Sequence, residues 1–448
     1  MKLADARRRL PVVAGLPQAA DRYGRPGAPR GNPTWAIWEL TLACDQKCVH
    51  CGPRAGQRRP HELDTDECLR VVAELKDLGC GEVVLIGGEA YLRNDFILVV
   101  RAIREAGMKC MITTGGLNLD DDRLAAMIDA GMSSLAVSID GLEATHDGLR
   151  GVPGSWRAAF STLRRARAAG LPIASNCQIN QRTRHELLDL LELLAAEGIR
   201  AWQLQLTVAH GNAADHPELI LQPYMVPELF VTLERVIDRC NALGIRFWPA
   251  NSLGYFGPLE TRLRAALRTH WRGCGAGVNT LGIDSDGGIK NCPSLGGPLN
   301  VGGNWRERSI REIWDDSYQL GYIRRRTLDD LWGYCRECYY AETCMAGCTA
   351  ASEPLLGRPG NNPFCAHRAE VMQARGLRER IEHVAPASGK SFDNGLFRVV
   401  REHIDPELRR VHGPVHVDEP RVSRAVEPFG PGRPIDGEAG QEPAQETA

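Results

Sequence analysis

Residues 40–56 of the chain read LTLACDQKCVHCGPRAG and place three cysteines close together, directly after an apolar run. The thiols of Cys44, Cys48 and Cys51 are separated by three residues and then by two. Disulfides join cysteines in pairs, so three neighbouring thiols leave one over, and a structural zinc site normally uses four ligands. Three thiolates are typical of a metal centre that keeps one coordination position open, as catalytic metal sites do. This stretch is therefore a candidate metal-binding loop.

The composition indicates a globular protein of two or three domains. The chain has 448 residues, of which 43% are hydrophobic and 25% charged, and its net charge is -2. Such a balance gives no reason to expect nucleic acid or a membrane as a partner. No apolar run is long enough for a transmembrane helix or an export signal. We expect a cytoplasmic protein, in which 15 cysteines indicate metal ligation or catalysis rather than disulfides.

Short apolar runs alternate with amphipathic segments after about residue 34. The runs expected to be strands are TWAIWELT, EVVLIGG, KCMITT, SLAVSID, PIASNCQIN and AWQLQLT. The segments expected to be helices include residues 65–78, 96–106, 123–130 and 185–196. Six strand–helix units predict an α/β fold, a partial TIM-like (β/α)6 barrel. Sites in such barrels gather at the carboxyl ends of the strands, where the three-cysteine loop lies.

The composition also divides the chain into four parts. We expect a flexible N-terminal arm over residues 1–33, the barrel over 34–250, a small cysteine-rich domain over 251–385, and over 386–448 a C-terminal extension that is largely disordered at its end. Within the cysteine-rich domain, the stretch VNTLGIDSDGGIKNC predicts a β-hairpin that turns at Asp286, Gly287 and Gly288.

The spacing of Cys44, Cys48 and Cys51 resembles the cluster-binding loop of radical S-adenosylmethionine (SAM) enzymes. In that family three thiolates hold a [4Fe–4S] cluster, and the fourth iron chelates the amino and carboxylate groups of SAM. His50 stands where the family usually has an aromatic residue beside the adenine. A buried, hydrogen-bonded histidine without that role is the alternative, and the sequence does not separate the two.

Further residues at the predicted strand ends resemble the SAM-binding segments of the family. The candidate SAM contacts are Gly87, Gly88, Glu89, Ser138, Asp140, Arg150 and Asn180. Glycines let the backbone approach a ligand closely, and a carboxylate suits an ammonium group. The alternatives are a simple Gly-Gly turn and, for Arg150, a structural ion pair. Alternation along the fifth strand also places Asn176, Gln178 and Asn180 on one face. Together with Gln205, these polar side chains suit a barrel lumen that holds substrate.

Seven cysteines in the C-terminal third resemble the SPASM domain, an extension of radical SAM enzymes that binds two auxiliary [4Fe–4S] clusters. The resemblance spans residues 34–370 and implies that one cluster is held by Cys335, Cys338, Cys344 and Cys365, and the other by Cys274, Cys292 and Cys348. Some relatives have an eighth cysteine that this chain lacks, so the fourth ligand of the second cluster is open. A zinc ribbon is the alternative. The other five cysteines, Cys68, Cys80, Cys110, Cys177 and Cys240, are expected to be buried.

The resemblance implies reductive cleavage of SAM to a 5′-deoxyadenosyl radical that abstracts hydrogen from a substrate. Because relatives with this architecture mostly modify peptides, we expect a maturase that oxidatively modifies a ribosomally made precursor peptide. The expected partners are that peptide, an electron donor such as flavodoxin or ferredoxin, and a separate leader-binding protein. The alternatives are a radical SAM enzyme acting on a small molecule in cofactor or haem-related biosynthesis, and a non-catalytic iron–sulfur or zinc protein. The sequence identifies no general base.

Overall fold

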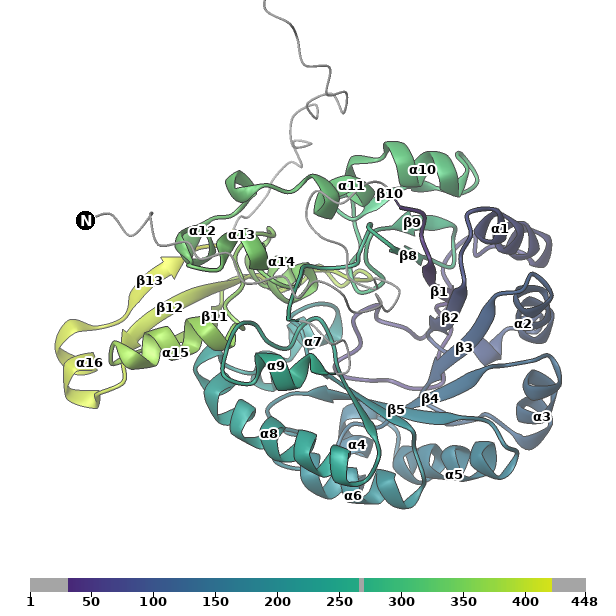
Figure 1. Ribbon diagram of the computed structural model, residues 1–448, viewed down its shortest axis with the longest axis horizontal. Coiled ribbons are helices and arrows are strands. Elements are labelled where there is room, and N and C mark those ends of the chain that lie inside the picture. Colours follow the sequence, from purple (N-terminus) through teal and green to yellow (C-terminus); the bar gives the residue numbers. More distant parts are fainter. Residues whose placement is uncertain (1–30, 266–269, 421–448) are drawn as a thin grey trace, which may run out of the picture.

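The computed structural model describes residues 31–265 and 270–420, and a curved sheet that wraps partway into a barrel is its central feature (Figure 1). The predicted N-terminal arm, apart from its last three residues, and the end of the C-terminal extension lie outside the described residues. Parallel pairing joins β1 to β7 in chain order. These strands are β1 Trp35–Thr41, β2 Glu82–Gly87, β3 Lys109–Thr114, β4 Ser134–Ser138, β5 Ile173–Ile179, β6 Ala201–Leu206 and β7 Arg246–Pro249.

Helices cover the outer face of the barrel strands (Figure 1). They are α1 Thr65–Asp77, α2 Phe96–Glu105, α3 Asp121–Asp129, α5 Ser155–Ala168, α6 Leu187–Ala196 and α8 Val226–Ala242. The shorter helices α4 Glu143–Arg150, α7 Asn212–Asp215 and α9 Glu260–Leu263 follow β4, β6 and β7. The start of α1 shows how the local sequence fixes an element. The Asp64 side chain accepts from the Glu67 backbone N–H, and the Glu67 side chain caps Asp64 in return. The predicted strand–helix alternation is confirmed.

The predicted hairpin joins the barrel sheet. Its strands β8 Thr280–Ile283 and β9 Gly288–Lys290 are antiparallel, and β10 Val301–Asn304 follows β9. β8 pairs in parallel with β1, so the cysteine-rich region extends the sheet at its first strand. The sheet therefore has ten strands, against the six that the periodicity predicted. β7 was missed because Arg246–Pro249 is only four residues long and ends in a proline.

The cysteine-rich region continues as short helices that lead to a second sheet. The helices are α10 Ile310–Asp316, α11 Tyr318–Arg325, α12 Gly333–Glu337, α13 Ala341–Cys344, α14 Thr349–Leu356 and α15 Ala366–Ala374. The second sheet is antiparallel, with β11 Leu377–His383, β12 Phe397–His403 and β13 Val415–Asp418, and α16 Pro406–His412 between the last two strands. The predicted boundary after residue 385 falls in the loop between β11 and β12, so ordered structure continues into the region predicted as an extension.

Strand β5 shows how the barrel separates its core from its lumen. Burial alternates along Ile173–Ile179, and Cys177 lies on the buried side while Asn176 and Gln178 lie on the partly exposed side. The outer side packs on the helices, and the inner side remains available to a ligand. Among the described residues, no helix combines the length and the apolar character that crossing a membrane requires.

Candidate active site at the mouth of the barrel

One cavity of about 480 Å³ brings the two parts of the chain together. Its wall includes two groups of cysteines, one from the loop after β1 and one from the cysteine-rich region: Cys44, Cys48, Cys51, Cys274, Cys292 and Cys348. Its size is that of a site for an organic ligand. Residues separated by some 300 positions in the sequence therefore face the same space.

The first three cysteines lie in a loop that is tied down on both sides. The Glu89 backbone N–H donates to the Ala43 carbonyl at 2.7 Å, and the Lys47 N–H donates to the Arg150 carbonyl at 3.0 Å. Burial holds the pKa of the Cys44 thiol well above its ordinary value and raises the pKa of Cys51 to about 12. Buried thiols of this kind carry charge only beside a compensating cation, so the donor set fits a metal cluster.

The Gly-Gly-Glu segment lies against this loop. A Cβ atom at Gly88 would come within 2.1 Å of the Ala43 carbonyl oxygen, so the close approach requires glycine. The Glu89 carboxylate accepts from the Gly115 N–H at 2.6 Å and from the Thr114 hydroxyl. Burial, together with the nearby Asp45 carboxylate, raises the pKa of Glu89 to about 8. A cation at this position would favour the charged form.

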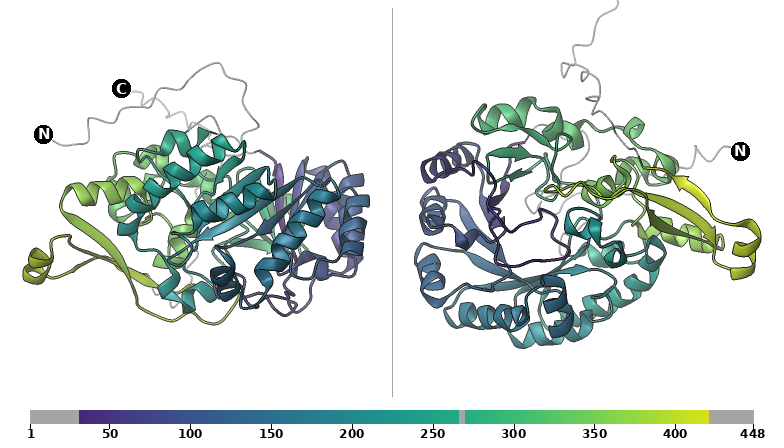
Figure 2. Two further views of the ribbon diagram at one scale, coloured as in Figure 1. Left: turned by 90° about the horizontal axis from the view of Figure 1, so that it is seen from below. Right: turned by 180° about the vertical axis from the view of Figure 1, so that it is seen from behind.

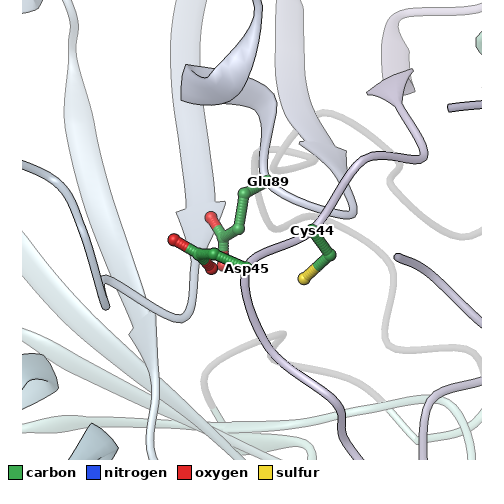
Figure 3. Close-up of side chains that lie close together, drawn as sticks. All are labelled: Cys44, Asp45 and Glu89. Atoms are coloured by element: carbon green, nitrogen blue, oxygen red, sulfur yellow. The ribbon is translucent and has the colours of Figure 1, made fainter. Parts of the chain in front are cut away.

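Asp45 is a candidate site residue that the sequence did not reveal. Ligand atoms of Cys44, Asp45 and Glu89 lie within 4.8 Å of one another, and Figure 3 shows the two carboxylates facing each other beside the thiol. Tyr91 and Asn118 donate to Asp45 Oδ2 at 2.6 and 3.0 Å, whereas Asp45 Oδ1 is buried and has no hydrogen-bond partner among the residues that the structure describes. Asp45 is not part of the cavity wall, but a positively charged group held between Cys44 and Glu89 would lie within reach of its carboxylate.

The third predicted cluster of residues is built around Asp140. Burial alone would raise the pKa of the Asp140 carboxyl, but the charges of Arg150 and His50 outweigh burial and hold this pKa well below its usual range. Arg150 Nη2 lies 2.6 Å from Asp140 Oδ2, and His50 Nε2 lies 3.0 Å from the same oxygen. His50 is thus buried and hydrogen-bonded, and Arg150 is ion-paired, yet both also line the cavity. Arg150 Nη1 in addition reaches Cys48 Sγ at 3.8 Å.

The predicted SAM contacts do not all reach the cavity. Gly87, Gly88, Glu89, Ser138 and Arg150 line it, whereas the buried Asp140 is not part of its wall and touches it only through Arg150 and His50. Asn180 is fully buried, and its side chain is used locally. Its carbonyl accepts from the backbone N–H groups of Arg182 and Thr183 at 2.9 and 3.1 Å, and its amide donates to Thr207. Asn180 therefore stabilises the turn after β5. The prediction placed it on the lumen face, but the alternation of side chains between the two faces ends with the strand at Ile179.

Amide side chains from two neighbouring strands also line the cavity. Asn176 and Gln178 come from β5, and Gln203 and Gln205 come from β6. The pairing register sets Asn176 opposite Gln203 and Gln178 opposite Gln205. This wall offers several hydrogen-bond donors and acceptors without charge.

The seven cysteines of the C-terminal third lie in two groups. In the first group the Cys274 thiol lies close enough to Cys292 and Cys348 to raise the pKa of both, and Cys292 also raises the pKa of Cys348. A second group behaves in the same way and consists of Cys335, Cys338, Cys344 and Cys365. Burial is the main cause of the raised pKa in both groups, so both donor sets fit metal centres. The five cysteines that were expected to be structural are all buried.

Comparison with known proteins identifies the architecture. The radical SAM superfamily matches residues 38–194, and the SPASM iron–sulfur cluster-binding domain matches residues 274–339. The chain is a radical SAM enzyme with a SPASM domain. The enzyme therefore uses SAM, a [4Fe–4S] cluster and auxiliary iron–sulfur clusters.

The relatives of this radical SAM/SPASM enzyme differ in their reactions. An AdoMet-dependent heme synthase of Methanosarcina barkeri is 28% identical over 353 residues, which cover 75% of this chain and 97% of that protein. The mycofactocin maturase MftC of Mycolicibacterium smegmatis is 28% identical over 342 residues, which cover 74% of this chain and 82% of that protein.

Two solved structures share the fold. The enzyme anSMEcpe with bound AdoMet has a TM-score of 0.60 at 15% identity and covers 76% of this chain and 97% of its own. Streptococcus suis SuiB bound to SAM has a TM-score of 0.57 at 18% identity and covers 71% of this chain and 74% of its own.

Proposed function

We propose that this radical SAM/SPASM enzyme oxidatively modifies a peptide, by cross-linking, dehydrogenation or excision. The wall of Asn176, Gln178, Gln203 and Gln205 is the observation that carries the proposal, because an extended peptide backbone needs both donors and acceptors along its length. Among the described residues of the cavity wall, Arg150 is the single arginine or lysine, and Asp140 neutralises it. A ligand with little negative charge suits this lining.

We assign the ligand-binding residues as follows. Cys44, Cys48 and Cys51 hold the SAM cluster; the Gly-Gly-Glu segment and Asp45 face the SAM ammonium; and Ser138 and Arg150 contact the rest of SAM. The auxiliary clusters number two, held by Cys335, Cys338, Cys344 and Cys365 and by Cys274, Cys292 and Cys348. When bound, the clusters and SAM supply the electron and the radical chemistry.

The chain's own residues bind, orient and exclude water. Glu89 and Asp45 hold a cationic group beside Cys44. The Asp140 carboxylate fixes Arg150 and His50 on the cavity wall, and its Oδ1 accepts from the Gln178 backbone N–H at 2.7 Å. The end of β5 is thereby tied to the SAM wall, so substrate held on β5 and β6 lies at a defined distance from SAM.

A tetrapyrrole is the second candidate substrate, and the comparisons favour it over a peptide. Heme synthases and an Fe-coproporphyrin III synthase are among the relatives, and the Methanosarcina barkeri heme synthase is matched over nearly its whole length. Coproporphyrins carry several carboxylates, which proteins usually bind with arginine or lysine. The cavity wall does not favour this candidate, because its arginine, Arg150, is already paired with Asp140 and not with a ligand carboxylate.

One anaerobic assay separates the two candidates. The reconstituted full-length enzyme is incubated with SAM, dithionite and either a synthetic peptide encoded beside its gene or Fe-coproporphyrin III. Peptide modification predicts a peptide that has lost two hydrogen atoms, or a backbone fragment, for each SAM consumed. Turnover of Fe-coproporphyrin III with an unchanged peptide would overturn the proposal in favour of the second candidate.

A further inference from the structure

The loop between β11 and β12 crosses from the second sheet to the active-site cavity. We name residues 384–396 the strap; the right-hand view of Figure 2 shows this segment running toward the barrel. Its backbone is held at the cavity mouth by three hydrogen bonds. The Phe392 N–H donates to the Gly52 carbonyl at 3.1 Å, the Gly211 N–H to the Asp393 carbonyl at 2.9 Å, and the Gly395 N–H to the Ala209 carbonyl at 3.3 Å.

An ion pair fastens the strap to the loop of the first three cysteines. Arg54, three residues after Cys51, donates from Nε to Asp393 Oδ1 at 2.9 Å. The same guanidinium donates to Asn212 at 3.0 Å and lies 2.5 Å from Asp215. Asp393 also accepts from the Lys390 N–H at 3.0 Å, which shapes the turn of the strap. Arg54 therefore connects the cysteine loop, the loop after β6 and the strap.

Phe392 projects from the strap into the cavity wall. The Lys290 ammonium lies 4.0 Å from the centre of its ring, and the His210 ring lies 5.8 Å away. Lys290 is itself fixed, since it is buried and its Nζ lies 2.5 Å from Asp284 Oδ1. A Cβ atom at Gly296 would lie 2.8 Å from the Cβ of Phe392, so the ring needs the space that this glycine leaves.

The neighbours of Phe392 place it between the two cysteine groups of the cavity. Gly52 follows Cys51, and Lys290 precedes Cys292 by two residues. A substrate in this cavity lies between the same two groups. The ring presents an apolar surface in a cavity whose wall also carries amide side chains.

We propose that the strap covers the cavity and that Phe392 is a substrate-positioning residue, against which an apolar or aromatic part of the substrate packs. The strap must open for substrate to enter and close for the reaction, and the contact of Arg54 with Asp393 holds it closed. The assignment rests on the proposed cluster-binding residues of the cavity, and it holds for either candidate substrate.

Three variants of the full-length reconstituted enzyme test the cover. Phe392→Ala removes the ring, Asp393→Asn weakens the ion pair, and Lys390→Ala changes an exposed strap residue as the control. The probe is EDTA, and the measurement is the rate of iron loss below the melting temperature of each variant. The first two variants should lose iron at least about threefold faster than wild type, whereas Lys390→Ala should match it. Equal rates in all four proteins would overturn the cover.

Hydrogen exchange and kinetics test the positioning role. In Asp393→Asn, amides of residues 209–211 and 392–395 should exchange faster, while those of α5 should not change. With the substrate that reacts, Phe392→Ala should raise KM by about tenfold. It should also raise the number of 5′-deoxyadenosine molecules formed for each molecule of product. Phe392→Leu should bring both quantities part of the way back to their wild-type values. Unchanged KM and coupling in Phe392→Ala would overturn the positioning role. If neither substrate reacts, the proposed function fails, while EDTA and exchange still decide whether the strap covers the cavity.

Discussion

At the scale of single residues, the two carboxylates beside Cys44 explain how the site attracts a cation. Glu89 is fully enclosed and its pKa is raised to about 8, so a neutral acid is favoured until a positive group arrives. Asp45 leaves one oxygen without a hydrogen-bond partner at the same point. Two acids that face each other repel, and an ammonium between them relieves that repulsion.

The variants Glu89→Gln and Asp45→Asn should therefore weaken SAM binding. A charge-assisted hydrogen bond contributes about 1.5–3 kcal/mol, so each change should raise the Kd by about ten- to a hundredfold. Equilibrium dialysis with labelled SAM measures this directly. The matched control is Asp122→Asn in the first turn of α3, which should bind like wild type. Wild-type affinity in both site variants would contradict the carboxylate assignment.

A second residue-scale prediction concerns the cluster loop. Cys48→Ala removes one of three thiolates that we assign to the SAM cluster, and two thiolates do not hold it. Formation of 5′-deoxyadenosine from SAM and dithionite should fall to the background level. Cys68→Ala, a buried cysteine of α1 outside the cavity, is the control and should retain activity. Wild-type yields from Cys48→Ala would exclude the loop as the cluster site.

The sequence could predict residues that stand in a recognisable spacing or at a strand end. The cysteine groups, the Gly-Gly-Glu segment and the amides of β5 all have such a pattern, and the structure brings two of the three cysteine groups to one cavity with the other two features. Asp45 has none, because its role depends on contacts with Tyr91 and Asn118 from two other segments. Phe392 lies in a loop 341 positions after Cys51, and no local pattern links the two.

At the scale of elements, periodicity predicted those with a repeating apolar face. β1 to β6 and the longer helices have such a face, and α1 carries a capping box as well. β11 and β12 are different, because charged residues recur along both and are paired across the sheet or with α15. A strand whose partners are arginine and glutamate does not show the apolar alternation on which sequence prediction depends.

The second sheet depends on one buried arginine. Arg368 in α15 donates to Glu379 at 2.6 Å, to Asp418 at 2.7 Å and to Asn361 at 2.8 Å, so it joins the helix to β11 and β13. Its charge also lowers the pKa of the Cys335 and Cys365 thiols, although burial keeps the pKa of both above the ordinary value.

Replacing Arg368 with methionine should leave the buried Asp418 carboxylate without its positive partner. The buried Glu379 carboxylate would lose part of its compensation. Loss of one partner from a buried ion pair costs about 3–5 kcal/mol, so the free energy of unfolding should fall by that amount. Thermal and denaturant unfolding followed by circular dichroism measure the change. Arg410→Met, which breaks the exposed pair with Glu407, is the control and should unfold like wild type. Equal stability of the two variants would show that the network does not hold the sheet.

At the scale of the whole molecule, the sheet itself joins the two cofactor regions. β8 pairs with β1, and one cavity is lined both by Cys44, Cys48 and Cys51 and by Cys274, Cys292 and Cys348. The second auxiliary group, Cys335 to Cys365, is not part of the cavity wall. This arrangement orders the proposed clusters: one at SAM, one at the substrate cavity and one farther from it. An electron that leaves the substrate would meet the Cys274 group first.

That order predicts how iron is distributed among the three groups. If each holds a [4Fe–4S] cluster, the full-length protein reconstituted under anaerobic conditions should contain about twelve irons, and the triple alanine variant at Cys44, Cys48 and Cys51 about eight. The auxiliary groups are built from separate thiols, buried or half-buried, so their occupancy should not depend on the first loop. Iron and sulfide analysis gives the counts, and electron paramagnetic resonance of the reduced variant should still show auxiliary signals. Stoichiometric zinc with little iron would identify the C-terminal groups as zinc sites, and about four irons in the triple variant would leave only one auxiliary cluster. Alanine at Cys274 should remove the cluster next to the substrate, lowering product formation while SAM cleavage persists, because Cys274 is not among the three thiols that we assign to the SAM cluster.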